Sequence, residues 1–105
     1  MNHLHSFIED YIMKKIRLDG KKMTDRKSAH EYIAKKLGFP DYYGNNLDAL
    51  HDCLCEISEE TCVSLINSDE FVENLGAYHK GFIRVFEDST KENDRLTFRC
   101  KIKAE

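Results

Sequence analysis

The sequence predicts a small α/β domain in which a three-stranded parallel sheet is flanked by about four helices. Strand-like and helix-like segments alternate along the chain of 105 residues, and 41% of these residues are hydrophobic. This length and composition suffice for one compact core but not for two. Because strands that are joined by helical crossovers run in the same direction, the order strand, two helices, strand, two helices, strand predicts a parallel sheet.

The first strand is expected over residues 12–18, where apolar and charged side chains alternate. The first helix is expected over about 25–37, because Asp25 can cap its start and apolar residues recur at helical spacing up to Gly38. A loop over residues 41–46 follows, and its asparagines are natural caps for a second helix.

The second helix is expected to be amphipathic, because at about 100° per residue its apolar and polar residues fall on opposite sides. The side expected to face the core carries Leu47, Leu50, Cys53, Leu54 and Ile57. The side expected to face solvent carries Asp48, His51, Asp52, Cys55 and Glu56.

The second half of the chain repeats the pattern of strand and helices. Residues 61–66 form a nearly continuous apolar run, which is typical of a buried parallel strand. A short helix is expected from Ser68 and a longer one over about 77–90, followed by a half-exposed strand over 96–102. The core is expected to include Tyr32, Phe71, Phe82 and Phe86. The histidines expected at the surface or partially buried are His3, His5, His30 and His79.

Charge is unevenly distributed along the chain. Residues 1–36 hold nine Lys and Arg against five Asp and Glu, residues 37–79 hold none against nine, and residues 80–105 hold seven against five. The middle segment therefore carries a net −9 and can steer a positively charged partner. The same segment argues against a nucleic-acid partner, because phosphate-binding surfaces need clustered Lys and Arg.

The cysteines, Cys53, Cys55, Cys62 and Cys100, are expected to be reduced thiols, because no segment resembles an export signal. No stretch approaches the roughly 18 consecutive apolar residues of a membrane span. We therefore expect a cytoplasmic protein without membrane association. A Cys-x-Cys pair without a second pair is a weak zinc motif, so we expect neither a metal nor a cofactor.

The acidic side of the second helix and the loop before it are the candidate functional segment. Asp48, Asp52 and Glu56 are spaced four residues apart without Lys or Arg beside them, and each such pair costs the helix a few tenths of a kcal/mol. This spacing alone is also compatible with a plain solvated face. The loop adds two tyrosines, a glycine and two asparagines, which favours a surface that binds a partner.

Residues 40–54, with the sequence PDYYGNNLDALHDCL, resemble the central motif of the barstar family, which inhibits ribonucleases such as barnase. Weaker similarity extends over residues 14–40, over 85–86 and over the last strand. We therefore expect one domain over residues 1–105, in which residues 1–13 are an N-terminal extension of unclear role. The resemblance implies a three-stranded parallel sheet with flanking helices and a protein that is not an enzyme. It also implies a partner, namely a basic extracellular-type ribonuclease, barnase-like or related, whose active-site cleft receives the second helix and the preceding loop. We expect the free protein to be a monomer.

The resemblance also implies which residues contact the partner. These residues are Tyr42, Gly44, Asn46, Asp48, His51, Asp52, Cys55 and Asp88. Asp52 is the acid that is expected to enter the phosphate-binding site. His51 stands where the family often has a tryptophan, and Cys55 replaces a small hydroxyl residue, which favours a cognate ribonuclease with a differently shaped cleft edge over barnase itself.

Two other function classes are compatible with the sequence. An enzyme could pair His51 with Asp52, or with Cys55 one turn later, as base and nucleophile, but no oxyanion-stabilising loop or third orienting group is evident. A non-inhibitory or immunity-type module could bind another basic protein or toxin through the same surface. A nuclease captured from the same cell would favour ribonuclease inhibition over the second alternative.

Overall fold

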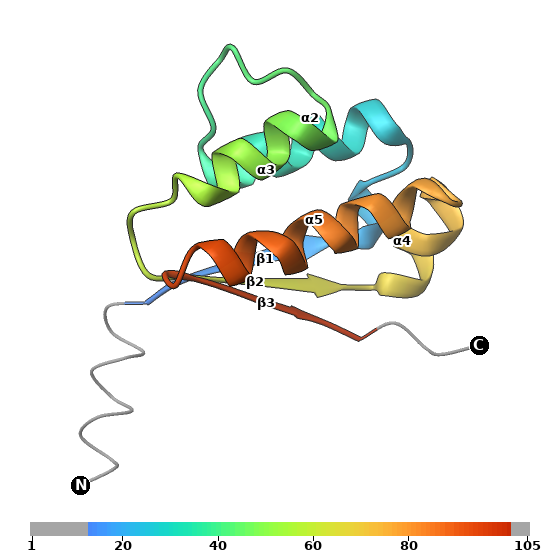
Figure 1. Ribbon diagram of the computed structural model, residues 1–105. Coiled ribbons are helices and arrows are strands. Elements are labelled where there is room, and N and C mark those ends of the chain that lie inside the picture. The colour runs from blue at the N-terminus through green and yellow to red at the C-terminus, as the bar shows by residue number, and fades with distance from the viewer. Residues whose placement is uncertain (1–12, 102–105) are drawn as a thin grey trace, which may run out of the picture.

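The computed structural model describes residues 13–101 and contains one parallel sheet covered by helices (Figure 1). The strands are β1 (Lys14–Asp19), β2 (Thr61–Ile66) and β3 (Leu96–Cys100), and they lie in the order β1-β2-β3. The helices of the described residues are the short 3-10 helix η1 (Gly20–Lys22) and the α-helices α2 (Arg26–Leu37), α3 (Leu47–Cys55), α4 (Ser68–Leu75) and α5 (Tyr78–Glu92). The predicted α/β fold is therefore confirmed. His3, His5 and all of the predicted extension except Met13 lie outside the described residues.

The central strand β2 pairs in parallel with both of its neighbours. Val63 lies between Ile16 of β1 and Phe98 of β3 in the register of the sheet. Four of the six residues of β2 are buried and the other two are partly buried, as predicted for a buried parallel strand. The first strand begins at Lys14 because the pairing with β2 begins there, and the Lys14 amide donates a hydrogen bond to the Glu60 carbonyl at 2.8 Å.

Local capping signals explain where α2 begins and ends. The Asp25 side chain accepts a hydrogen bond from the Ser28 amide at 2.8 Å, and the Ser28 hydroxyl accepts one from the Asp25 amide at 3.0 Å. This reciprocal pair satisfies amides that the first turn of a helix leaves free. The helix ends at Gly38, whose φ of 70° is in the left-handed region that glycine adopts without a steric penalty.

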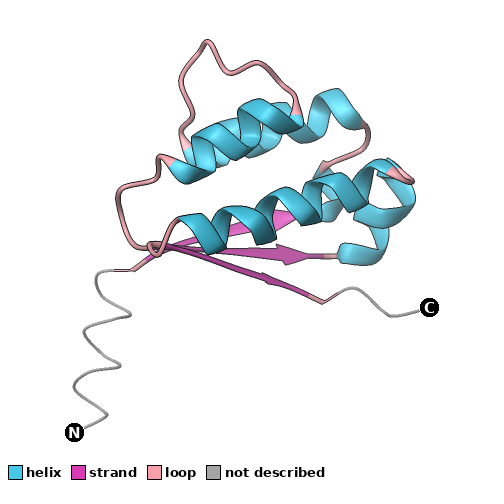
Figure 2. Ribbon diagram, in the orientation of Figure 1, coloured by secondary structure: helices cyan, strands magenta, loops and turns pink. Residues whose placement is uncertain are grey.

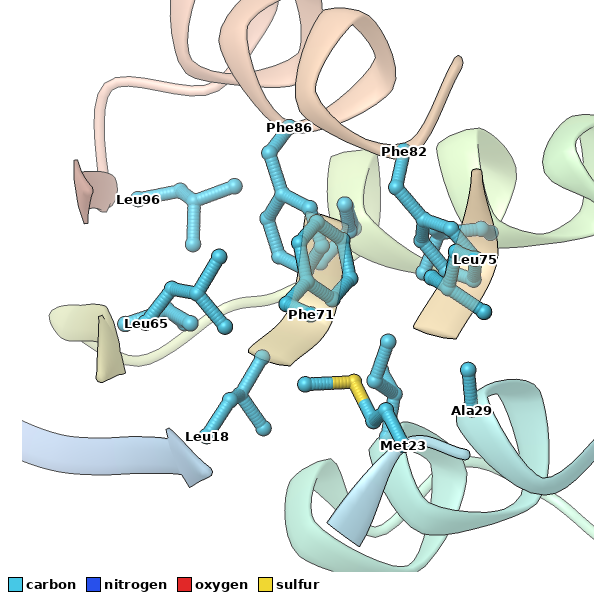
Figure 3. Packing of buried hydrophobic residues seen from close by; sticks show 13 residues of the cluster. Leu18, Met23, Ala29, Leu65, Phe71, Leu75, Phe82, Phe86 and Leu96 are labelled. Atoms are coloured by element: carbon cyan, nitrogen blue, oxygen red, sulfur yellow. The ribbon is translucent and has the colours of Figure 1, made fainter. Parts of the chain in front are cut away.

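The core lies between the sheet and the helices. Figure 3 shows Phe82 and Phe86 pointing from α5 toward Leu18 of β1 and Phe71 of α4. These four side chains are buried, which confirms the prediction for the three phenylalanines. Tyr32 packs against the same core but is only partly buried, and its hydroxyl accepts a hydrogen bond from the Asp19 amide at 2.9 Å.

His30 of α2 is fully buried, with 0% of its surface exposed, so the prediction of a surface or partially buried residue was wrong. Both of its ring nitrogens have partners, because Nδ1 lies 2.7 Å from the Tyr43 hydroxyl and Nε2 lies 2.9 Å from the Tyr78 hydroxyl. Burial lowers the pKa of His30 to about 4, and the positive charge of Arg26 acts in the same direction. The imidazole is therefore neutral at pH 7.

Candidate protein-binding surface

The loop that connects α2 to α3 projects beyond the helices, as the pink segment in Figure 2 shows. Tyr43 anchors this loop from inside, because its hydroxyl contacts His30 and its ring lies 5.1 Å from the Phe39 ring, measured between centroids. The neighbouring Tyr42 is 85% exposed. These contacts give Tyr43 a structural role. Tyr42 is free to contact a partner.

Asn46 connects the loop to α3. Its side-chain oxygen accepts a hydrogen bond from the Ala49 amide at 2.7 Å, and its amide group donates to the Gly44 carbonyl at 3.3 Å. The predicted cap of α3 is thereby confirmed. Asn45, directly before it, has a φ of 55°, a conformation that asparagine tolerates better than most residues. Gly44 and Asn46 are both exposed and flank the start of the helix.

We expect Asn46→Ala to lower the free energy of unfolding by about 1 kcal/mol, because the first turn of α3 loses its side-chain cap. Urea unfolding measures this change. Asn46→Ser is the matched control, since a serine hydroxyl also caps helices and should retain most of the stability. Equal stability of the alanine variant and the unchanged protein would contradict the assigned capping role.

Helix α3 buries one side and exposes the other, as its spacing predicts. Leu50 and Leu54 are fully buried, and the other predicted core-facing residues, Leu47, Cys53 and Ile57, are partly buried. On the opposite side Asp48 and Asp52 are exposed, and the side chain of Asp52 is 79% accessible to solvent. Within residues 13–101 neither carboxylate forms an ion pair with Lys or Arg.

Two contacts hold α3 against α5. Gly81 of α5 lies so close to Leu47 that a Cβ at this glycine would be 2.6 Å from Leu47 Cδ1. At the other end, the buried Asn93 side chain donates hydrogen bonds to the carbonyls of Leu54 at 2.9 Å and Ile57 at 3.0 Å. Because carbonyls in the last turn of a helix lack partners within the helix, Asn93 stabilises the end of α3. The acidic face is thus presented by a helix that is fixed at both ends.

His51 and Cys55, predicted to face solvent, are partly buried because Glu92 at the end of α5 lies beside them. His51 Nε2 is 2.9 Å from Glu92 Oε2 and 3.6 Å from Cys55 Sγ. Sequence reasoning missed Glu92, although its position one helical turn after Asp88 was a signal for it. Asp88 itself is partly buried on α5, and its carboxylate makes no hydrogen bond or ion pair with the other described residues.

The contacts of His51 do not form a catalytic triad. Glu92 and Cys55 both lie beside the same nitrogen, Nε2, whereas a triad needs the acid on one ring nitrogen and the nucleophile on the other. Asp52 lies 3.9 Å from the other nitrogen, which exceeds hydrogen-bond distance. Burial, together with the neighbouring acids, also raises the pKa of the Cys55 thiol, so the reactive thiolate is disfavoured at neutral pH.

The state of the cysteines and the length of the helices also bear on the class of protein. All four cysteines are free thiols, as predicted. Along residues 13–101 no helix combines the length and the apolar character needed to cross a bilayer. A parallel α/β domain that presents exposed carboxylates, without Lys or Arg partners among residues 13–101, and an exposed tyrosine in the preceding loop has the features of a protein-binding domain with an acidic interface.

Comparison with known proteins identifies the family. A family model described as "Barstar (barnase inhibitor)" matches residues 13–103. The chain is also similar to a Bacillus subtilis (strain 168) protein with the name "Putative ribonuclease inhibitor YrdF", with 36% identity over 81 residues that make up 76% of this chain and 89% of the relative. The chain therefore belongs to the barstar family. Proteins of this family are inhibitors, which confirms the prediction that the chain is not an enzyme.

Proposed function

We propose that this protein inhibits a basic ribonuclease by inserting α3 and the loop before it into the active-site cleft. The observation that carries the proposal is the pair of exposed carboxylates, Asp48 and Asp52, one turn apart on α3 and without a Lys or Arg partner in residues 13–101. Because like charges at this spacing destabilise a helix, an external cation that binds both of them offsets this cost. Family membership supports a ribonuclease as the source of these cations.

The physical basis of inhibition is replacement of the phosphate charge. A ribonuclease cleft that binds RNA gathers cationic side chains, and carboxylates placed there form charge-assisted hydrogen bonds in place of the phosphates. The inhibitor then competes with RNA for the same groups. The segment of residues 37–79, with its net −9, also accelerates the encounter with a basic enzyme.

The rigidity of α3 supports this mode of binding. Asn46 caps its start, Asn93 holds its end, and Tyr43 ties the preceding loop to the buried His30. A surface that is already ordered loses little conformational entropy when it binds. The exposed Tyr42, in the loop before α3, adds a flat aromatic surface that a partner can contact.

The proposed contact set consists of Tyr42, Gly44, Asn46, Asp48, His51, Asp52 and Cys55, with Asp88 at the edge. His51 and Cys55 differ from Asp48 and Asp52, because Glu92 already holds them from within the molecule. Because these two residues also depart from those that the family often has, their positions are where the partner's cleft is expected to differ from that of barnase. We propose that the protein acts as a monomer in the cytoplasm, where it protects the cell from a ribonuclease that is meant for export.

An RNA-cleavage assay tests the proposal. Purified protein is titrated into candidate secreted ribonucleases from the same organism, and the cleavage rate of a fluorogenic RNA is measured. We expect cleavage to stop near one equivalent of inhibitor, and the association rate to fall as salt is added, because exposed charges are screened. Tight binding of a basic protein without ribonuclease activity, and no inhibition of any ribonuclease, would instead indicate an immunity-type module.

A further inference from the structure

Three side chains with metal-binding atoms converge where the end of α3 meets the end of α5. His51 and Cys55 lie one turn apart on α3, and Glu92 is the last residue of α5. Their ligand atoms all lie within 4.8 Å of one another. The nearest pairs are His51 Nε2 to Glu92 Oε2 at 2.9 Å, Cys55 Sγ to His51 Nε2 at 3.6 Å and Cys55 Sγ to Glu92 Oε1 at 4.0 Å.

These separations are close to those of a tetrahedral zinc site. Zinc bonds of about 2.0 Å to nitrogen and oxygen and about 2.3 Å to sulfur imply ligand atoms about 3.3–3.5 Å apart. The contacts of 2.9–4.0 Å involve both carboxylate oxygens of Glu92, and with one ligand atom from each residue all three atoms lie within 4.8 Å of one another. Rotation of the Glu92 carboxylate and modest side-chain movements therefore suffice to bring three ligand atoms onto one ion. Two of the ligands come from one face of a single helix, as the i, i+4 spacing in known zinc motifs does.

The surroundings also favour a cation. The C-terminal end of a helix carries partial negative charge, and Cys55 is the last residue of α3. The exposed Glu56 follows directly, and residues 37–79 contain no Lys or Arg. The Ser89 hydroxyl, one turn before Glu92 on α5, is buried and has no hydrogen-bond partner among the described residues. This hydroxyl is a polar group with unused bonding capacity on the helix that carries Glu92.

We propose that His51, Cys55 and Glu92 form a binding site for Zn²⁺ or a similar borderline-soft divalent cation. The combination of imidazole, thiolate and carboxylate selects such an ion over Mg²⁺ and Ca²⁺, which prefer all-oxygen sites. When the ion binds, the Cys55 thiol loses its proton to solvent and the thiolate becomes a ligand. Three protein ligands leave one position open, so water or an outside group completes the coordination.

Cobalt titration of the full chain, kept reduced and free of ribonuclease, tests the site. Co²⁺ is a spectroscopic substitute for Zn²⁺, and a thiolate ligand produces a charge-transfer band in the near ultraviolet. We expect this band at one equivalent of Co²⁺, together with the visible bands of a tetrahedral site, and we expect Zn²⁺ to abolish both. Because the free protein is used, the result does not depend on the proposed inhibition.

Variants assign the ligands. Cys55→Ser should remove the charge-transfer band, and Glu92→Gln should weaken Co²⁺ binding at least tenfold, since changes even outside the ligand shell cost about 10–100-fold. Cys53→Ser is the matched control, because this thiol lies on the same helix and belongs to no cluster among the described residues. Circular dichroism verifies that each variant is folded. Absence of the band in the unchanged protein, its persistence in Cys55→Ser, or unaltered affinity in Glu92→Gln would overturn the proposal.

Discussion

Replacement of Asp52 by alanine is expected to weaken binding to the cognate ribonuclease by about 2–5 kcal/mol, the loss found when one member of a desolvated charge pair is removed. In the proposed complex Asp52 neutralises cationic groups that otherwise hold the phosphate. Without the carboxylate these groups remain desolvated and unpaired. Isothermal titration calorimetry or inhibition kinetics measures the change. Asp48→Ala is expected to cost less, because Asp52 is the acid placed at the phosphate site.

The free structure separates this effect from a loss of stability. The Asp52 side chain is 79% exposed, and its nearest ionic neighbour, His51 Nδ1, is 3.9 Å away. Its removal therefore breaks no strong internal contact and relieves repulsion with Asp48. We expect the free energy of unfolding of Asp52→Ala to stay within about 0.5 kcal/mol of the unchanged value.

Glu73→Ala on α4 is the control, since it removes one exposed carboxylate outside the proposed surface and changes the net charge equally. It should leave the dissociation rate unchanged. If Asp52→Ala bound the ribonuclease as tightly as Glu73→Ala does, the central role of Asp52 would have to be abandoned.

Acidification is expected to destabilise the fold through His30, by up to about 3 kcal/mol between pH 6.5 and 4. The ordinary pKa of 6.5 applies to the unfolded chain, whereas burial lowers the pKa to about 4 in the folded protein. Between these values the unfolded chain binds more protons, so protonation favours unfolding. The stability contributed by neutral His30 is complete above pH 6.5 and declines as the pH falls toward 4.

A non-titrating variant isolates this contribution. His30→Gln retains an amide that can bond to Tyr43 or Tyr78 but carries no ionisable group, so its stability should depend less on pH over this range. Urea unfolding at several pH values between 7 and 4.5 measures the difference between the two proteins. His79→Gln is the control for general effects of losing an imidazole. His79 is partly exposed, and its ring contacts a backbone carbonyl. If the free energies of unfolding of His30→Gln and the unchanged protein differed by the same amount at every pH, titration of His30 would not be the cause of the acid destabilisation.

Helix positions were predictable because their signals are local. Asp25, Asn46 and Gly38 lie within one turn of the helix ends that they cap, so the sequence alone located α2 and the start of α3. The amphipathic spacing of α3 likewise predicted that Leu50 and Leu54 are buried and that Asp52 is exposed, because one helix determines this geometry without help from its neighbours.

Long-range contacts could not be read from the sequence in this way. His30 and Tyr78 are 48 positions apart, and His51 and Glu92 are 41 apart, so no local pattern indicates that they meet. The buried histidine was consequently taken for a surface residue, and the acid beside Cys55 was missed. The contact with His30 is also what distinguishes Tyr43, which anchors the loop, from the exposed Tyr42.

Periodicity, capping residues and charge order were therefore sufficient to predict the α/β fold and the acidic face of α3, and the motif of residues 40–54 carried the family resemblance. The packing of α5 against α3 was needed to establish which polar side chains remain available to a partner, namely Asp48 and Asp52, and which are engaged internally, namely His51 and Cys55. The reason is physical: the faces of one helix follow from its own repeat, whereas contacts between helices depend on the folding of the whole chain.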